Sequence, residues 1–574
     1  MSSVQEPGFL LSGRSRRRAV PQTLATPSQA ARWEPSITLA VALLAVAVRL
    51  FFWYYTRRTW EDGLITLQHA ENAARGFGLT HVPGGPRVHG FTSPISVLIP
   101  LLGELLHTGF GLPLLKLISA LSAGFTVWLA MRIARRLGLA FPIALLIGGY
   151  LALEHQQILF GMAGMESQLA AMLLLFSIYS LFELRPLWVG IGLGLCMLVR
   201  PDFVLWVPVA LVLMLWHCWS RRNYAPLETV GLALLLTYGP WLAFTTWYYG
   251  GPLPNTILAK FWAYSQAWYR GLPPAQIALG AAVRARSLFL PLGPCYGGNG
   301  GPALPVAFDP HGVISGAVAL LAVIGLVVAL TKKQLAATAI AGFLAVYSLY
   351  FVIAVGAVFP WYVVPLNAVA ILAAGLGLDW LVKSAFRGRW RSLVGYSLAT
   401  AYLAVFVAII PATFRGERNL QRFVEDGGRK RVGLYLASIV QPGQTIGCEA
   451  LGYFGYYSRR LIFDYPGLAN PQVVRFLRDH PAERNLDSML GYFHPDYIVL
   501  RPQEYNGGLT AGDSWLLTDY QLIAKFQVPE EEQRTLLMPE YNIDLTFYIL
   551  RLKSVAGNAP AMSRTDPLAT SRPD

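Results

Sequence analysis

Long apolar stretches separated by short polar breaks dominate the first 412 residues of this 574-residue chain. A membrane-spanning helix needs roughly 17 to 25 mostly apolar residues to cross about 30 Å of hydrocarbon. Only 14% of all residues are charged, against about 25% in an ordinary soluble domain. The pattern predicts an α-helical polytopic membrane protein. About eleven spans are expected, at 36–55, 113–131, 140–158, 166–183, 187–199, 202–219, 227–248, 311–331, 335–357, 361–381 and 392–412.

Short basic clusters decide how residues 93–109 are interpreted. This segment is apolar but interrupted by two prolines, a glutamate and a histidine. Counting it as a span would place Arg132, Arg135 and Arg136 outside, against the rule that basic loops face the cytoplasm. As an interfacial segment, it lets every cluster fall inside. The clusters are Arg14/Arg16/Arg17/Arg18, Arg132/Arg135/Arg136, Arg221/Arg222, Lys332/Lys333 and Lys383/Arg387/Arg389/Arg391.

The predicted domains follow from this topology. Residues 1–35 form a disordered cytoplasmic N-terminus, and residues 36–412 form a membrane domain with outer loops at 56–112 and 250–310. Short β-rich runs alternate with helical patterns over 415–553, which predicts an extracytoplasmic α/β domain. Residues 554–574 are rich in Ser, Pro, Ala and Thr, which is typical of a disordered tail.

The net charge of +14 does not indicate nucleic-acid binding. From Pro411 to Asp574 there are 18 basic and 19 acidic residues, so the predicted outer domain is close to neutral. The positive excess lies in the clusters beside the spans.

Glu61 and Asp62 form an acidic pair just after the first span. Charges beside hydrocarbon are costly, which favours a function for the pair. In one interpretation Asp62 is only the N-cap of a helix over 63–75; in another it is a general base held at the membrane surface. Glu61 is the second predicted catalytic residue, as a metal ligand or as a partner that tunes the pKa of Asp62; alternatively it is simply solvated. A divalent cation (Mg²⁺, Mn²⁺ or Ca²⁺) bridging the two carboxylates is chemically reasonable, although nothing in the sequence demands one.

Further polar residues fall on the same predicted outer face. Arg200 and Asp202 form either an ion pair at a helix boundary or a site for an anionic substrate. Glu166 begins a span, where it suits the helix dipole, and Lys260 belongs to a basic outer loop or is simply solvated. The candidates for substrate binding are Arg58, His89, Glu166, Arg200, Asp202, Asn255 and Lys260.

Several short motifs together resemble a known family. They are Trp60–Gly63 with Arg75–Leu79, Gly90–Pro94, Gly164–Ser167, Arg200–Asp202, Pro254–Thr256 with Ala259–Lys260, Phe359–Tyr362 with Pro365, and, in the outer domain, Ile446–Phe454 and Phe463–Leu468. The chain resembles the GT-C polyprenyl-phosphate-sugar glycosyltransferases of bacterial membranes, and within them the mycobacterial terminal arabinofuranosyltransferases. Glu61 stands where that family commonly has Asp, and His89 where Glu is expected.

The resemblance implies an inverting sugar transfer at the outer face of the bacterial plasma membrane. Asp62 would be the base, with Lys260 and Arg200 meeting the departing phosphate. The implied partners are a polyprenyl-phosphate sugar donor, with arabinofuranose as the first choice, and a cell-envelope glycan or glycoprotein acceptor. A mannosyl or another pentosyl or hexosyl donor remains an alternative, as do a transporter and a non-catalytic glycan-binding scaffold.

Overall fold

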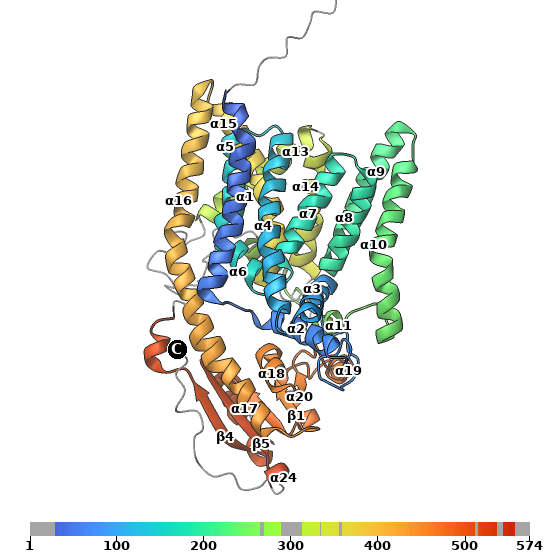
Figure 1. Cartoon of the computed structure of the whole chain (residues 1–574), viewed down its shortest axis with the longest axis vertical. Helices are drawn as coiled ribbons and strands as arrows, with labels where there is room; N and C mark the ends of the chain where they lie inside the picture. Colours follow the sequence, from blue (N-terminus) through green and yellow to red (C-terminus); the bar gives the residue numbers. More distant parts are fainter. Residues whose placement is uncertain are drawn as a thin grey trace, which may run out of the picture.

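The protein consists of a bundle of membrane helices with an α/β domain at one end (Figure 1). The structure, a computed structural model, describes residues 29–264, 269–288, 313–332, 334–354, 359–510, 515–536 and 544–556. Most of the predicted disordered segments 1–35 and 554–574 lies outside these residues. The first helix begins at Gln29, ahead of the predicted start of the first span.

Each predicted span corresponds to a helix or to a bent pair of helices. Among the described residues, seven helices are long and apolar enough to cross a membrane, or eight if one bent pair is a single span; three further predicted spans are shorter apolar helices. The helices are α1 (Gln29–Thr56), α4 (Gly111–Arg136), the bent pair α5 (Phe141–Leu153) and α6 (His155–Met162), α7 (Ser167–Phe182), α8 (Pro186–Val199), η1 (Pro201–Leu205) with α9 (Trp206–Arg221), α10 (Ala225–Tyr249), α13 (Val313–Lys332), α14 (Leu335–Leu349) with η2 (Tyr350–Ala354), η3 (Pro360–Tyr362) with α15 (Val363–Ala385), and α16 (Arg389–Asn419).

Short helices lie between the bundle and the α/β domain. They are α2 (Glu61–Ala74), α3 (Pro94–Leu106) and α11 (Asn255–Tyr264) (Figure 1); α12 (Pro274–Leu288) follows α11 along the chain. The chain leaves α1 and re-enters the bundle in α4 at the same end, because Lys116 Nζ donates to the Arg58 carbonyl at 2.6 Å. The segment between these two residues, which includes α3, therefore does not cross the bundle.

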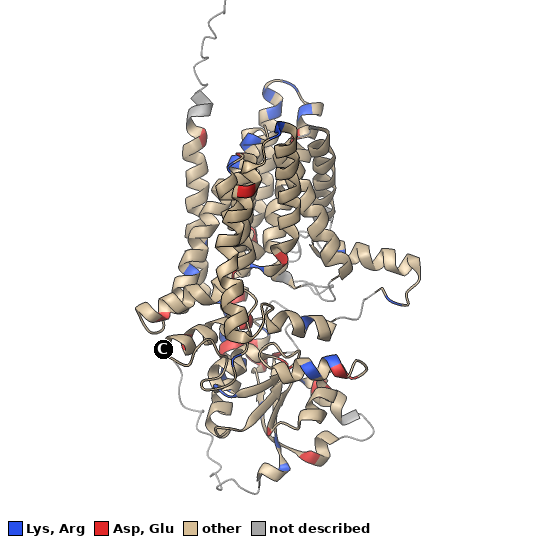
Figure 2. Cartoon of the chain, turned by 90° about the vertical axis from the view of Figure 1, so that its right-hand side faces the viewer, with Lys and Arg blue, Asp and Glu red and all other residues tan. Residues whose placement is uncertain are grey.

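The opposite end of the bundle carries the basic clusters. Arg135, at the end of α4, pairs with Glu34 of α1 at 3.1 Å. Lys383, at the end of α15, donates to the Gly138 carbonyl at 2.9 Å. Figure 2 shows Lys and Arg gathered at this end, away from the α/β domain.

The last membrane helix runs into the α/β domain without a break. Helix α16 continues through the π-helical turns of η4 (Leu420–Lys430) into α17 (Arg431–Ile439). The predicted domain boundary near residues 412–415 thus falls inside a continuous helix, so the two domains are joined by rigid structure.

The C-terminal domain has a five-stranded sheet in the order β2-β1-β3-β5-β4. Strands β1, β2 and β3 are parallel, and β4 and β5 complete the sheet in antiparallel pairs. This confirms the predicted fold class. The strands are β1 (Thr445–Cys448), β2 (Leu461–Asp464), β3 (Tyr497–Leu500), β4 (Tyr520–Gln527) and β5 (Thr546–Leu552), and the helices are α18 (Leu451–Ser458), α19 (Pro471–Asp479), α20 (Leu486–Phe493), α21 (Pro502–Thr510), α22 (Trp515–Asp519), α23 (Glu530–Gln533) and α24 (Lys553–Ala556).

Helix α18 is the main contact between the C-terminal domain and α2. A Cβ on Gly452 would lie 2.3 Å from the Glu61 carbonyl oxygen, so the two backbones meet directly. Tyr456 Oη donates to Glu71 Oε1 at 2.5 Å, and Arg459 pairs with the other oxygen of the same carboxylate. The domain is therefore held against the segment that carries the acidic pair.

Candidate active site

One pocket at the boundary between the two domains collects residues from distant parts of the chain. Its lining comes from the first loop, the α6–α7 and α8–η1 junctions, α11, η3 and the loop after β2. The lining residues include Asp62, Thr92, Glu166, Arg200, Thr256, Lys260, Tyr362 and Leu468. Four of the predicted site residues, namely Asp62, Glu166, Arg200 and Lys260, thus meet at one place.

Asp62 lies in the first turn of α2 and faces this pocket. The helix begins at Glu61 with Trp60 as its N-cap, so the interpretation of Asp62 as the N-cap is wrong. Trp60 N donates to the Ala163 carbonyl at 2.8 Å, which seats the start of the helix. Burial raises the pKa of the Asp62 carboxyl, while the nearby Lys260 cation opposes that shift. A carboxylate with a raised pKa is a better proton acceptor than an exposed one.

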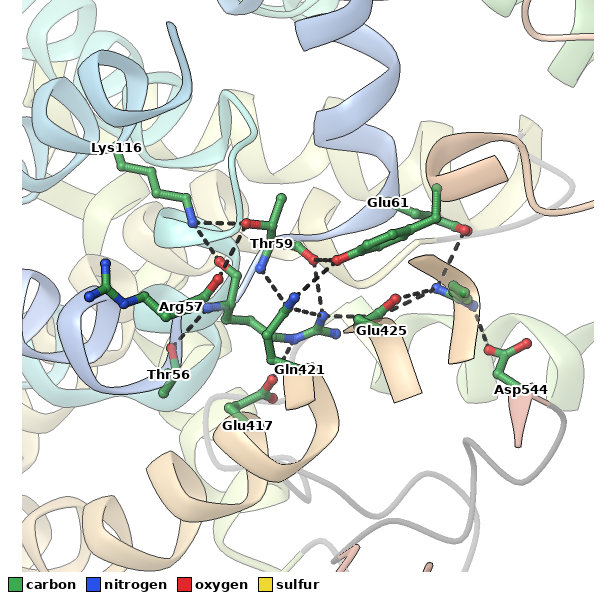
Figure 3. Close-up of polar contacts among 12 residues, drawn as sticks. Thr56, Arg57, Thr59, Glu61, Lys116, Glu417, Gln421, Glu425 and Asp544 are labelled. Atoms are coloured by element: carbon green, nitrogen blue, oxygen red, sulfur yellow. Dashed lines mark hydrogen bonds and ion pairs between the residues drawn. The ribbon is translucent and has the colours of Figure 1, made fainter. Parts of the chain in front are cut away.

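Glu61 points to a different partner. Neighbouring helical residues are about 100° apart around the axis, and Glu61 pairs with Arg429 Nη1 at 3.4 Å (Figure 3). Burial raises the pKa of the Glu61 carboxyl too, and Arg429 opposes the shift. Glu61 is absent from the pocket lining, so its predicted catalytic role does not fit the structure.

A metal ion bridging Glu61 and Asp62 does not fit this arrangement either. One carboxylate faces Arg429 and the other lies near Lys260, so each already has a cation beside it. Within the described residues, no group of three or more His, Cys, Asp and Glu side chains could hold a metal ion.

Lys260 is the cation of the pocket that lacks a close anionic partner. Its ammonium contacts Tyr362 Oη at 3.4 Å and lies 5.0 Å from the centre of the Phe359 ring. The electrostatic attraction of Tyr362 and Asp62 raises the pKa of Lys260, although burial acts in the opposite direction. Among the described residues no carboxylate lies within ion-pair distance of it, so Lys260 remains available for a substrate anion.

Arg200 is instead held by two carboxylates. Its Nε donates to Asp202 Oδ1 at 3.0 Å, and its Nη1 donates to Glu166 Oε1 at 3.2 Å. Asp202 also accepts from Tyr347 Oη. The ion pair at the helix boundary is therefore present, and Arg200 fixes Glu166 at the pocket wall.

The C-terminal domain closes one side of the pocket. Asn255 Nδ2 donates to the carbonyls of Gly467 and Leu468, at 2.8 and 3.0 Å. Next to it, Thr256 Oγ1 hydrogen-bonds Thr92 Oγ1 at 3.0 Å across the pocket lining. The Asn255 side chain thus ties α11 to the loop that carries Leu468, and the structure does not place it among the lining residues.

Arg58 is not at the pocket, contrary to the sequence-based expectation. Its guanidinium is buried, with Nε 2.7 Å from Glu417 and Nη1 2.9 Å from Glu425. Gln421 accepts from Thr59 N at 3.0 Å in the same cluster (Figure 3). Arg58 therefore joins the first loop to the long helix of α16 and η4.

His89 is also absent from the lining. Its ring stacks on Tyr249 with 4.7 Å between ring centroids and packs edge-on against Phe91. Burial lowers the pKa of His89 to about 3, so the ring is neutral. Its side chain therefore supports the loop by packing, and the predicted substrate contact does not fit.

The sequence-based candidates omitted some residues that the structure places at or near the site. Tyr362 and Thr256 line the pocket, and both belong to motifs that carry the family resemblance, which was the available signal. Glu449 acts on Asp62 electrostatically and pairs with Arg501 at 2.5 Å. Glu449 falls within the Ile446–Phe454 motif of the family resemblance. Nothing in the sequence placed it near Asp62, because only folding brings the C-terminal domain against α2.

Fold and site together define a polytopic membrane protein with a charged pocket where the bundle meets a C-terminal α/β domain. Solved structures share this architecture. The archaeal oligosaccharyltransferase AglB from Archaeoglobus fulgidus, in complex with an inhibitory peptide and a dolichol-phosphate, aligns with a TM-score of 0.51 and 14% identity over 84% of this chain and 72% of that one. ArnT from Cupriavidus metallidurans in the apo state aligns with a TM-score of 0.50 and 12% identity over 91% of this chain and 98% of that one. The chain therefore shares its overall fold with these two structures, which agrees with the predicted fold class of a polytopic helical membrane protein with a C-terminal α/β domain.

One further structure aligns with a lower TM-score, and one family model matches only part of the chain. ArnT bound to undecaprenyl phosphate aligns with a TM-score of 0.49 and 14% identity over 90% of this chain and 97% of that one. Residues 414–546 match a family described as a domain of unknown function, DUF8728. No curated protein matches the chain significantly.

Proposed function

We propose that this protein is an inverting membrane glycosyltransferase that uses a polyprenyl-phosphate sugar as donor. The observation that carries the proposal is the presence of both Asp62 and Lys260 in one pocket at the end of the membrane bundle. A buried carboxylate with a raised pKa supplies a base, and a cation without a close anionic partner supplies a phosphate contact. Both are needed to transfer a sugar from a lipid phosphate.

In the proposed reaction, Asp62 accepts the proton of an acceptor hydroxyl. The hydroxyl oxygen forms a bond to the anomeric carbon from the face opposite the phosphate. The bond between that carbon and the phosphate oxygen breaks, and its electron pair leaves with the phosphate. A single displacement of this kind inverts the configuration of the sugar.

Lys260 is the stronger candidate for stabilising the departing phosphate. A developing negative charge is stabilised best by a donor that is already positioned and not neutralised. Arg200 is neutralised by Asp202 and Glu166, so it serves chiefly to hold the Glu166 carboxylate at the pocket. Glu166 is then placed to accept hydrogen bonds from sugar hydroxyls.

The proposed location is the outer face of a bacterial plasma membrane. The basic clusters gather at the end of the bundle away from the pocket, and basic loops favour the cytoplasmic side. AglB, which shares the fold, was solved with a dolichol-phosphate, so a lipid-phosphate ligand is compatible with this architecture. Arabinofuranose is the proposed sugar from the family resemblance alone, and a cell-envelope glycan or glycoprotein is the proposed acceptor.

The test is sugar transfer by the purified full-length protein from a panel of radiolabelled polyprenyl-phosphate sugars. The panel contains arabinofuranose, mannose, galactofuranose and another pentose, with cell-envelope glycan from the source bacterium as acceptor. Transfer from arabinofuranosyl lipid with inversion is the expected result. Transfer only from another sugar would overturn the choice of arabinofuranose as the donor sugar. Absence of transfer from every lipid-linked sugar would overturn the proposed function.

A further inference from the structure

A second hollow lies between the end of α1 and the helix that enters the C-terminal domain. It measures about 420 Å³ and shares no lining residue with the candidate active site. Its lining contains three arginines, two tyrosines and a single acid, Asp426. The lining residues are Tyr54, Tyr55, Thr56, Arg57, Arg418, Gln421, Arg422 and Asp426.

The three arginines of this hollow differ from the buried arginines nearby. Within the part of the chain that the structure describes, Arg57, Arg418 and Arg422 form no ion pair, and all three are exposed. Arg58 and Arg429, by contrast, are buried against glutamates. Three positive charges around one hollow without matching acids favour an anionic ligand.

The walls of the hollow are already ordered by contacts within the protein. Gln421 is buried, and its Oε1 accepts from Thr59 N at 3.0 Å. The Arg418 guanidinium lies 5.0 Å from the centroid of the Tyr55 ring. Figure 3 shows the Arg57 side chain pointing away from the cluster around Gln421. The hollow therefore does not need to be assembled by its ligand.

The position of the hollow identifies the kind of anion. The apolar candidate span of α1 ends at Thr56, and Arg57 follows it directly. The exposed Tyr54 ring lies in the last turn of the same helix. Tyrosines and arginines at the end of a span lie at headgroup depth, where tyrosine is enriched and basic residues attract anionic lipid.

We propose that this hollow binds the phosphate headgroup of an anionic membrane phospholipid. Arg57, Arg418 and Arg422 contact the phosphate, and Tyr54 and Tyr55 lie beside the glycerol backbone. The site is separate from the donor site, so its occupancy does not depend on the proposed glycosyltransferase activity.

Native mass spectrometry of the purified full-length protein tests this directly. The protein is titrated with phosphatidylglycerol or phosphatidylcholine, and the bound lipid is counted. We expect the wild type to prefer phosphatidylglycerol. The variant Arg57→Gln/Arg418→Gln/Arg422→Gln should lose affinity for it on the order of 100-fold, at roughly five-fold for each arginine.

The matched control removes three exposed arginines from the C-terminal domain. Arg431→Gln/Arg475→Gln/Arg478→Gln lowers the net charge equally and should leave lipid binding unchanged. Should the hollow's triple variant not fold, its three single substitutions carry the same test. Equal affinity for phosphatidylglycerol in the wild type and in the hollow variants would overturn the proposal. Displacement of the bound lipid by inorganic phosphate would also overturn it, because the hollow would then be a site for a soluble anion.

Discussion

Asp62 and Lys260 determine each other's charge state. Burial favours a neutral carboxyl on Asp62, and the Lys260 cation favours the ionised form. The carboxylate in turn helps to keep Lys260 protonated against the same burial. The balance leaves a base whose pKa lies above the ordinary aspartate value, next to a cation for the leaving phosphate.

Replacing Lys260 should shift the pH dependence of the reaction in a defined direction. In Lys260→Met the cation that lowers the pKa of Asp62 is lost, so this pKa rises further. Because Asp62 must be deprotonated to act, the acid limb of kcat/KM should move to higher pH, and KM for the lipid donor should rise. The measurement is a pH profile of transfer.

The control for this experiment is Lys525→Met on strand β4, which removes a lysine outside the pocket. It should leave the profile at the wild-type position. An unshifted acid limb in Lys260→Met would contradict the electrostatic link between the two residues.

Single residues were predictable where local sequence determined their place. Asp62, Glu166 and Arg200 stand at the ends of apolar runs, so hydropathy alone put them at the membrane boundary. Arg58 was misassigned because its partners Glu417 and Glu425 are more than 350 residues away in sequence. No local pattern reveals such a pairing.

At the scale of elements, α2 is held between the membrane bundle and α18. A Cβ on Gly63 would lie 2.7 Å from the Gly164 carbonyl oxygen, and a Cβ on Gly452 would meet the Glu61 carbonyl on the other side. At both glycines the neighbouring backbone lies closer than a residue with a Cβ atom would permit. The rigid position of Asp62 follows from this double contact.

A methyl group at the α18 contact should therefore disturb catalysis. Gly452→Ala forces α18 away from α2 and should destabilise the protein by about 1–3 kcal/mol, as overpacking does. Sugar-transfer activity should fall together with stability, and both are measured on the same variant, stability by thermal unfolding. Gly507→Ala is the matched control, since an added Cβ there meets nothing within 4 Å. Wild-type stability in Gly452→Ala would contradict the proposed contact.

The elements themselves were largely predictable from periodicity. All eleven apolar segments are helical over the residues that the structure describes. The β-rich runs of the sequence, at 445–448, 461–464, 497–501, 521–528 and 547–553, each coincide with an observed strand to within one residue at either end. The contact between α18 and α2 was not predictable, because it depends on a glycine and on backbone atoms. The continuity of α16 with α17 was also missed, since residues 412–431 change from apolar to polar and contain Gly416, Gly427 and Gly428, which disfavour a continuous helix.

The whole molecule has an asymmetric distribution of charge. Basic clusters lie at one end of the bundle and the C-terminal domain at the other, which supports the proposed outward orientation of the domain. The buried ion pairs Arg58–Glu417 and Arg58–Glu425 connect the two domains across that boundary. The proposed reaction then takes place on the same side as the domain.

Cysteine labelling of intact cells tests this orientation. In a Cys295→Ser background the other three cysteines are buried, so single introduced cysteines can be followed. Arg478→Cys on the C-terminal domain should react with a membrane-impermeant maleimide added outside, and Arg221→Cys at the end of α9 should not. The reverse pattern would place the pocket in the cytoplasm and contradict the outward orientation.

The most direct measurement compares sugar transfer by Asp62→Asn and Glu61→Gln in the same membranes. Asparagine keeps the size of the side chain but removes the base, so transfer should fall by about 10²–10⁴. Glu61→Gln changes a neighbouring carboxylate that faces Arg429, and it should stay within a few-fold of wild type. A wild-type rate of transfer by Asp62→Asn would contradict the role of Asp62 as the general base.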